Sequence, residues 1–445
     1  MKLGNALSAV ALVPKPEEFV NLRRHIDPEW LSAALAATGT ATIRRRRLPA
    51  EQVVWLVIGM ALMRDRSIQE VADKLDLALP APSGSGVASS ALVQARARLG
   101  EGPLCMLFEL CGEHWAHASA KRHPWNGLSV YAVDGSTLRV ADSEENAKHF
   151  GRARGHRGDS AYPLVRLVAL MAVRSHLIAA ATFGRYELSE AAYGEEIWQQ
   201  IPERSVTVVD RYFLSAGTLI PLARGEERHW LSRAKKSTKW NVTRKLGRGD
   251  YLVEMKVRAA LRKKDPSLPK TWTVRAISYQ RKGFKPQRLL TSMLDPEKYP
   301  ATEIVALYHE RWEIELAYDE IKTELLDREE TIRSRTPDKV NQEIWGILIA
   351  FNLVRLEMER IAAEAGVEPI RISFVMSLNL ICDEWLWSAV ASPGAIPRHL
   401  LSLRAKVRRF ILPPRRSHRS NPRAVKIKMS NYAKKRSSKP SRVLK

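Results

Sequence analysis

Cysteine is scarce in this chain: Cys105, Cys111 and Cys382 are the only ones among 445 residues. No two of them form a C-x-x-C pair, so the sequence indicates neither a zinc site nor a disulfide framework, and a reducing compartment fits. Long apolar runs are scarce as well. The longest strongly apolar run, residues 53–63, is too short to span a bilayer and is typical of a buried helix. We therefore expect a cytoplasmic protein that is not in a membrane.

Acidic residues are outnumbered, with 48 Asp and Glu against 72 Lys and Arg, which gives a formal net charge of +24. Residues 404–445 hold 16 basic residues and no acidic one, so the 56 basic and 48 acidic residues before them leave a net charge of +8. Such an excess favours a polyanionic partner, most often nucleic acid, with an anionic membrane surface as the alternative. From residue 413 onward we predict a segment that is disordered when free. It is either a DNA-binding arm or only a solubilising tail.

The spacing of apolar residues is helical near the N-terminus, mixed in the middle and helical again near the C-terminus. The middle gives the order strand–strand–strand–helix–strand–helix, which predicts a mixed α/β fold. The predicted parts are a helical N-terminal domain (17–120), an α/β domain (126–234 and 287–330) interrupted by a β-rich insertion (235–286), a helical C-terminal region (338–403) and a basic tail (404–445).

Four consecutive arginines, Arg44, Arg45, Arg46 and Arg47, lie between two predicted helices of the N-terminal domain. On a loop or at a helix start they could hold DNA phosphates. An ordinary solvated basic turn would have the same composition, and the sequence leaves both interpretations open.

Two carboxylates follow apolar strand segments. Asp134 comes after "YAV" and is followed by Gly135, which indicates a turn, and Asp210 comes after "VTVV". The commonest reason for such an Asp is a turn or a helix cap. In open α/β sheets, however, ligand sites gather at strand ends, and these two strands are expected to be neighbours.

The stretch "YHERWEIELAYDEIKTELL", residues 308–326, contains no Pro or Gly and predicts one continuous helix. At roughly 100° per residue, Tyr308, Arg311, Glu315 and Lys322 lie within about 60° of one another. Such a stripe is usually a solvated salt-bridge face. The alternative is a metal-binding carboxylate flanked by cations that hold phosphate.

Asp134, Asp210 and Glu315 would repel one another if they met at the strand ends, which raises carboxyl pKa values, and a divalent cation would remove that penalty. Hard oxygen ligands select Mg²⁺ or Mn²⁺. Two such ions about 4 Å apart can activate an attacking oxygen and stabilise the leaving one in phosphoryl transfer. The nearby histidines have no metal-ligand spacing and are expected to be phosphate or structural contacts: His149, His156 and His309.

The order of two strand-end aspartates and then Tyr-x-x-Arg-x-x-x-Glu-(six residues)-Lys resembles the DDE transposases of the insertion-sequence-4 family. The resemblance covers most of the chain, with "VDGSTLRVAD", "VVDRYF" and "YHERWEIELAYDEIK" as its catalytic segments. It implies a ribonuclease-H-like fold with a β-rich insertion after Asp210. It also implies that Asp134, Asp210 and Glu315 are catalytic and bind two Mg²⁺ or Mn²⁺ ions.

The same resemblance implies DNA contacts from Tyr308, Arg311 and Lys322, and Arg211 after the second Asp is a further candidate. The expected partners are the terminal inverted repeats and the target DNA, held by a homodimer or a higher assembly at the bacterial nucleoid. The helical N-terminal domain, with Arg44–Arg47, would help to recognise the repeats.

One departure concerns a tryptophan that some family members place just before the "LLT"-like strand, where it stacks on a flipped base. Here that neighbourhood reads "KPQRLLTS" and has no aromatic residue. Trp272, Phe284 or Trp312 could substitute, or base flipping is handled differently, although core packing is the commoner reason for an aromatic residue at each of the three positions. Stacking contributes roughly 1–3 kcal/mol per base, so the difference is of consequence.

Two other functions compete with metal-dependent transposition, which consists of phosphodiester hydrolysis at the transposon ends and strand transfer into target DNA. A nuclease of the same fold would cut without joining strands. A catalytically decayed regulator would bind DNA without cutting it, and the intact acidic residues and helical signature argue against it.

Overall fold

The structure is a computed structural model, and it describes residues 25–41, 48–75, 87–155, 158–281, 285–326, 331–388 and 404–414. Several residues that carry predictions lie outside these ranges: Arg44, Arg45, Arg46, Arg47, His156, Phe284 and the tail from residue 415.

The N-terminal part is helical, as the apolar spacing predicts. Capping residues fix where two of these helices begin. Asp27 is the N-cap of the helix Pro28–Ala37, and Ser67 forms a capping box with Glu70 at the start of the helix Ile68–Lys74. The apolar run at 53–63 lies almost wholly in a buried helix. The elements are α2 (Pro28–Ala37), α3 (Ala50–Leu62), α4 (Ile68–Lys74), α5 (Ser89–Leu99), α6 (Gly102–Cys111), a π-helical turn (Gly112–Ala116) and α7 (His117–Arg122).

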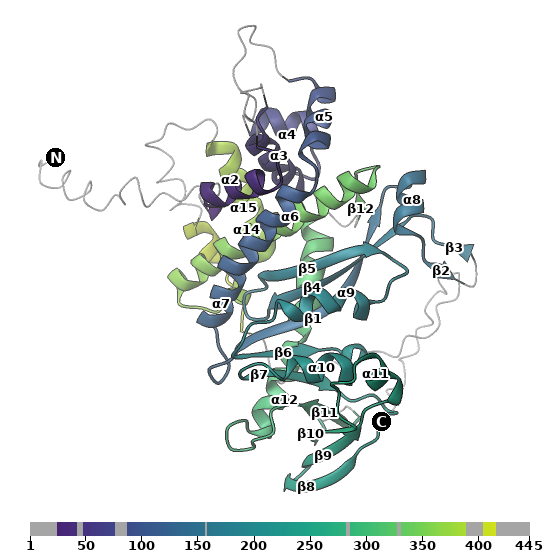
Figure 1. The fold of residues 1–445 in the computed structure, drawn as a ribbon. Coiled ribbons are helices and arrows are strands. Elements are labelled where there is room, and N and C mark those ends of the chain that lie inside the picture. Colours follow the sequence, from purple (N-terminus) through teal and green to yellow (C-terminus); the bar gives the residue numbers. More distant parts are fainter. Residues whose placement is uncertain are drawn as a thin grey trace, which may run out of the picture.

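A mixed sheet forms the centre of the molecule (Figure 1). Its strands are β1 (Ser129–Val140), β4 (Leu164–Ala172), β5 (Ile178–Arg185), β6 (Ser205–Val209) and β7 (Arg228–Arg233). The order is β5-β4-β1-β6-β7, in which β4 is antiparallel to its neighbours and β6 and β7 run parallel to β1. This is a ribonuclease-H-like arrangement, and it confirms the predicted fold class. A two-residue strand, β12 (Thr331–Ile332), also pairs with β1.

Two helices follow strands of this sheet, α9 (Glu190–Gln199) and α10 (Ala216–Leu222), and both were predicted from the sequence. Ser189 caps α9 by accepting a hydrogen bond from the backbone of Ala192. Helix α8 (Glu144–Phe150) and the short hairpin of β2 (Arg154–Gly155) and β3 (Gly158–Asp159) were not predicted.

The turn predicted at Asp134–Gly135 is wrong, because β1 runs through both residues without interruption. Asp134 pairs with Ala169 and Gly135 with Val168 of β4, so the sheet overrides the local turn signal of Asp-Gly. A Cβ atom at Gly135 would fall 2.4 Å from Cδ of Glu190, so any larger residue would force that side chain to move.

The insertion extends the central sheet (Figure 1). Strand β11 (Gln287–Thr291) pairs with β7, and the order continues through β10 (Thr271–Tyr279) and β9 (Asp250–Lys256) to β8 (Asn241–Gly247). A short helix, α11 (Ala259–Lys264), connects β9 and β10. The strand-like composition of residues 235–286 therefore predicted the strands but not their continuity with the sheet.

The predicted helix over residues 308–326 has two interruptions. It consists of α12 (Ala301–Glu310), α13 (Trp312–Asp319) and a π-helical turn, η5 (Glu320–Leu325). At Arg311 the backbone hydrogen bonds span three residues, from Arg311 N–H to the carbonyl of Tyr308 at 3.2 Å and from Ile314 N–H to that of Arg311 at 3.3 Å. The helix thus tightens at Arg311 and widens after Asp319, which changes the spacing of the predicted stripe. These three segments are called the signature helix below.

The C-terminal region is helical where it is described. Its elements are α14 (Pro337–Ala365) and α15 (Phe374–Ser388), with single 3₁₀ turns at Pro369–Arg371 and Arg408–Phe410. Helix α14 lies between the N-terminal helices and the sheet (Figure 1), and it is buried along most of its length. In the described parts of the chain, no helix has the length and apolar character needed to cross a membrane.

Candidate active site

Asp134 and Asp210 are brought together by the parallel pairing of β1 and β6. The last paired residues are Val133 and Val209, and the two aspartates come next on their strands. Strand β6 ends there, and Asp210 starts a 3₁₀ turn, so its carboxylate lies at a strand end as predicted. Asp134 instead lies within β1, which continues to Val140, at the point where the neighbouring strand β6 ends.

Arg311 connects this sheet edge to the signature helix. Its Nη1 atom lies 3.4 Å from Oδ2 of Asp134, and its Nη2 atom donates to Oε1 of Glu315 at 2.5 Å. The side chains of Asp134 and Glu315 are 19% and 34% exposed, so both carboxylates remain accessible from one side. Two of the three predicted metal ligands therefore share one guanidinium.

Two tyrosines of the signature helix complete the surroundings. The hydroxyl of Tyr318 donates to the backbone carbonyl of Asp134 at 2.8 Å, which fixes α13 against β1. Tyr308 is buried and forms a hydrogen bond with Arg311. Burial raises the pKa of Tyr308; the charge of Arg311 opposes this shift and that of Asp210 adds to it. The sequence had no signal for Tyr318.

Burial raises the pKa of Asp134 to about 6. The hydrogen bond from Gly135 N–H and the charge of Arg311 oppose this shift, and the charges of Glu190 and Asp210 add to it. Glu190 is a further carboxylate that sequence reasoning missed. It is neutralised by Arg166, whose Nη1 atom lies 2.9 Å from its Oε1 atom.

The oxygen donors of this site suit a hard divalent cation. Among the described residues, no group of three or more Asp, Glu, His or Cys side chains is arranged to hold a metal ion. In place of such an arrangement, Arg311 bridges Asp134 and Glu315. Asp134 and Glu315 thus share one positive charge, and their oxygen donors fit a hard divalent cation in its place.

Two other predicted DNA contacts lie in the described part of the chain. Lys322 is half-buried in η5, and Arg211 is exposed directly after Asp210. His309 contacts the hydroxyl of Tyr279 at 3.4 Å, and burial lowers its pKa to about 4, which fits a structural role. His149 is exposed on α8.

The aromatic candidates differ in their surroundings. Trp272 packs on Trp230, with ring centroids 5.5 Å apart, and one side of it lines a cavity. Trp312 is 44% exposed on the first turn of α13. The base-stacking role remains a prediction for each of them.

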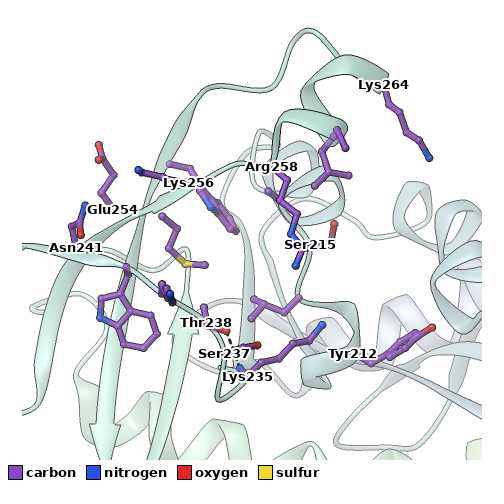
Figure 2. Close-up of a pocket in the computed structure, with 18 residues that line it drawn as sticks. Tyr212, Ser215, Lys235, Ser237, Thr238, Asn241, Glu254, Lys256, Arg258 and Lys264 are labelled. Atoms are coloured by element: carbon purple, nitrogen blue, oxygen red, sulfur yellow. Dashed lines mark hydrogen bonds between the residues drawn. The ribbon is translucent and has the colours of Figure 1, made fainter.

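A cavity of about 840 Å³ opens beside the site, between the 3₁₀ turn η4 (Arg211–Phe213), α11 and the strands β8 and β9 (Figure 2). Tyr212, two positions after Asp210, stands at one end of it. Five cations line the cavity, with Glu254 as the only acidic residue, and two indoles form part of its wall: Lys235, Lys239, Lys256, Arg258, Lys264, Trp240 and Trp272.

A ribonuclease-H-like sheet that carries adjacent aspartates, together with a helical Glu beside them, defines a phosphoryl-transfer enzyme of the DDE class. Residues 16–109 match the family "Insertion element 4 transposase N-terminal", and residues 125–353 match "Transposase DDE domain", which contains all three carboxylates. The chain belongs to the insertion-sequence-4 family of DDE transposases. It is an enzyme of DNA transposition, which confirms the resemblance and the predicted activity.

Two transposases have sequences similar to that of this chain. The transposase InsG of insertion sequence element IS4 from Escherichia coli (strain K12) is 38% identical over 436 residues, 97% of this chain and 98% of that protein. The putative transposase InsZ from the same strain is 33% identical over 229 residues, 51% of this chain and 75% of its own. A piggyBac transposase, solved as a synaptic complex with hairpin DNA, aligns with 88% of this chain and 83% of its own. The sequence identity there is 13% and the TM-score 0.41.

Proposed function

We propose that Asp134, Asp210 and Glu315 are the catalytic carboxylates of this transposase and hold two Mg²⁺ or Mn²⁺ ions. The observation that carries this proposal is the register of β1 and β6, which sets the two aspartates side by side, with Glu315 joined to Asp134 through Arg311. When bound, the ions would supply an activated oxygen nucleophile and stabilisation of the leaving oxygen. The chain's own residues bind and orient the DNA around that centre.

Arg311, Lys322 and Tyr308 are the proposed contacts to the phosphates next to the cut. A guanidinium binds a phosphate through two parallel hydrogen bonds, whereas Lys322 adds a point charge. Arg311 already bonds to carboxylates in this structure, so its donors face the reaction centre. Arg211 would contact the backbone on the side of Asp210.

The basic cavity supports a DNA path that leads away from Asp210. Its cations and indoles suit a nucleic-acid strand, because Lys and Arg neutralise phosphates and aromatic rings stack on bases. We infer that a strand entering or leaving the active site passes Tyr212 and lies along this cavity.

The wider assignments rest on the family. The substrate would be DNA with the terminal inverted repeats of the element, the product would be joined to target DNA, and two ends would be held by a homodimer or larger assembly. The enzyme would act in the cytoplasm at the nucleoid. We retain the division into a helical DNA-binding domain, a catalytic domain with its insertion, a helical C-terminal region and a basic tail.

A joining assay separates transposition from the rival functions. Duplexes that end in pre-cut termini of the element are incubated with the full chain, Mg²⁺ and supercoiled plasmid. Joined products are expected, and they should be lost with Asp210→Asn but not with Asp319→Asn, an exposed carboxylate of the same helix as Glu315. Cleavage of uncut ends without joining would favour a nuclease. Binding without either reaction would favour a regulator.

A further inference from the structure

The signature helix has a second charged face that the chemistry does not use. On a regular helix, at roughly 100° per residue, Glu310, Glu313 and Glu320 would lie about 140–160° around the axis from Glu315, and their contacts below show that they remain on a separate face despite the two irregular turns. These three residues are called the acidic face. They alternate along the helix with the reactive residues, because Glu310 immediately precedes Arg311, Glu313 is two positions before Glu315, and Glu320 begins η5.

The turn between β4 and β5 holds the first two members of this face. Arg174 binds Glu310 in a bidentate pair, with Nε 3.0 Å from Oε2 and Nη2 2.9 Å from Oε1. Nε2 of His176 lies 2.9 Å from Oε2 of Glu313. His176 has a φ of 63°, a left-handed conformation that residues with a side chain rarely adopt. The turn therefore holds His176 in a strained backbone conformation while its imidazole contacts Glu313.

Arg355 of α14 holds the third member. Its side chain is 1% exposed, and it donates to Glu320 and to Nδ1 of His176, the latter at 2.5 Å. Nδ1 of His176 also lies 3.4 Å from Oε2 of Glu320, so one imidazole contacts two carboxylates of the acidic face. Arg355, His176, Glu313 and Glu320 therefore form one connected network, and the pair of Arg174 and Glu310 lies on the same face of the helix.

The position of this network indicates a role in orienting the residues of the site in addition to packing the helix. A buried ion pair is poor evidence of stabilisation by itself, because desolvation offsets the attraction. Here Glu310 immediately precedes Arg311, Glu313 lies between Arg311 and Glu315 in the chain, and Glu320 starts the π-helical turn. Such turns are frequent at functional sites. A rotation of the helix would move Arg311, Glu315 and Lys322 together, and the network opposes that rotation from the opposite side.

We propose that Arg174, His176 and Arg355 are positioning residues that set the rotation of the signature helix and thereby the directions of Arg311, Glu315 and Lys322. This inference rests on the proposed catalytic role of Glu315. The three residues touch neither DNA nor metal, so their effect is on the rate of the chemical step and on the geometry of the ligands.

The test is single-turnover cleavage of DNA carrying the element's ends, at saturating DNA and at a temperature where every variant is folded. We expect Arg355→Lys and Glu320→Gln each to slow cleavage at least tenfold, while the Kd for the same DNA in Ca²⁺ changes less than twofold. The double variant should be no slower than Arg355→Lys alone, because both changes break one network. Ile361→Ala, a buried apolar change on α14, is the control for lost stability.

A second variant keeps the inference testable if the buried substitution Arg355→Lys prevents folding. Arg174→Gln changes a pair whose side chains are 31% and 29% exposed, and it should slow cleavage with unchanged DNA binding. The inference is overturned if folded Arg355→Lys and Arg174→Gln cleave at the parent rate. It is equally overturned if Ile361→Ala, at the same loss of melting temperature, slows cleavage as much. A parent protein that does not cleave at all would instead contradict the proposed function.

Discussion

Nη1 of Arg311 lies 3.4 Å from Oδ2 of Asp134, a residue 177 positions earlier in the chain. The same guanidinium donates to Glu315, so a single protein cation neutralises two carboxylates that we assign to metal binding. In the proposed mechanism, the carboxylates of the site and a phosphate of bound DNA therefore compete for the guanidinium of Arg311.

Replacing Arg311 by Gln separates these two roles. Without DNA, the affinity for Mn²⁺ should rise about tenfold, equivalent to about 1.4 kcal/mol, because a cation that competes for the carboxylates is gone. Cleavage should nevertheless fall by about two orders of magnitude, because a donor aimed at developing charge is lost. Mn²⁺ titration followed by electron paramagnetic resonance and single-turnover cleavage measure the two effects. Arg185→Gln, on an exposed pair, is the control, and an unchanged Mn²⁺ affinity would contradict the bridging role.

Asp134→Asn should stabilise the metal-free protein at neutral pH. The folded pKa of Asp134 is raised from 3.8 to about 6, so the folded state binds more protons between these values and its stability falls as the pH rises through them. The gain should be about 1–3 kcal/mol at pH 7.5 and vanish below about pH 4. Denaturant unfolding in EDTA at both pH values measures it, with Asp319→Asn as the control. A loss of stability, or a difference independent of pH, would be incompatible with the buried carboxylate.

Addition of Mg²⁺ should stabilise the folded chain through the same carboxylates. At a concentration tenfold above the Kd, a bound ion adds about 1.4 kcal/mol to the free energy of unfolding. Glu315→Gln and Asp210→Asn should abolish most of that gain, whereas Asp319→Asn should keep it. Thermal melting with and without Mg²⁺ gives the comparison. If both site variants are stabilised like the parent protein, the ions bind elsewhere.

The basic cavity predicts a change in salt dependence. Each Lys that contacts a phosphate contributes about 0.7–0.9 to the slope of log K against log salt concentration. The double variant Lys239→Gln/Lys256→Gln should therefore flatten the slope for DNA by about 1–2, measured by fluorescence anisotropy. Lys121→Gln/Lys148→Gln, with the same change of charge on exposed helical positions, should leave it unaltered. Equal slopes for both pairs would remove the cavity from the DNA path.

Local sequence signals identified most of the elements around the site. The apolar runs before Asp210 and after Tyr162 are the strands β6 and β4, and the polar stripe from Tyr308 to Lys322 is helical except for the turn at Arg311. These features depend on side-chain periodicity within one segment, which a sequence displays directly.

Other features depend on contacts between distant segments. The Asp-Gly pair of β1 has the local signature of a turn, and only pairing with β4 keeps it extended. The partners of the acidic face come from a turn and a helix far away in the chain, so the sequence alone did not connect Glu310, Glu313 and Glu320 to them. Buried ionic networks of this kind are decided by tertiary packing.

The central claim is that Asp210 binds the catalytic metal, and a change of ligand softness tests it most directly. In Asp210→Cys a thiolate replaces a carboxylate, and thiolates bind Mg²⁺ poorly and softer ions such as Mn²⁺ better. We predict that cleavage of the element's ends is lost in Mg²⁺ and restored at least tenfold in Mn²⁺, whereas Asp319→Cys is active in both. Asp210→Cys that cleaves normally in Mg²⁺, or that stays folded and inactive in both metals, would contradict the account.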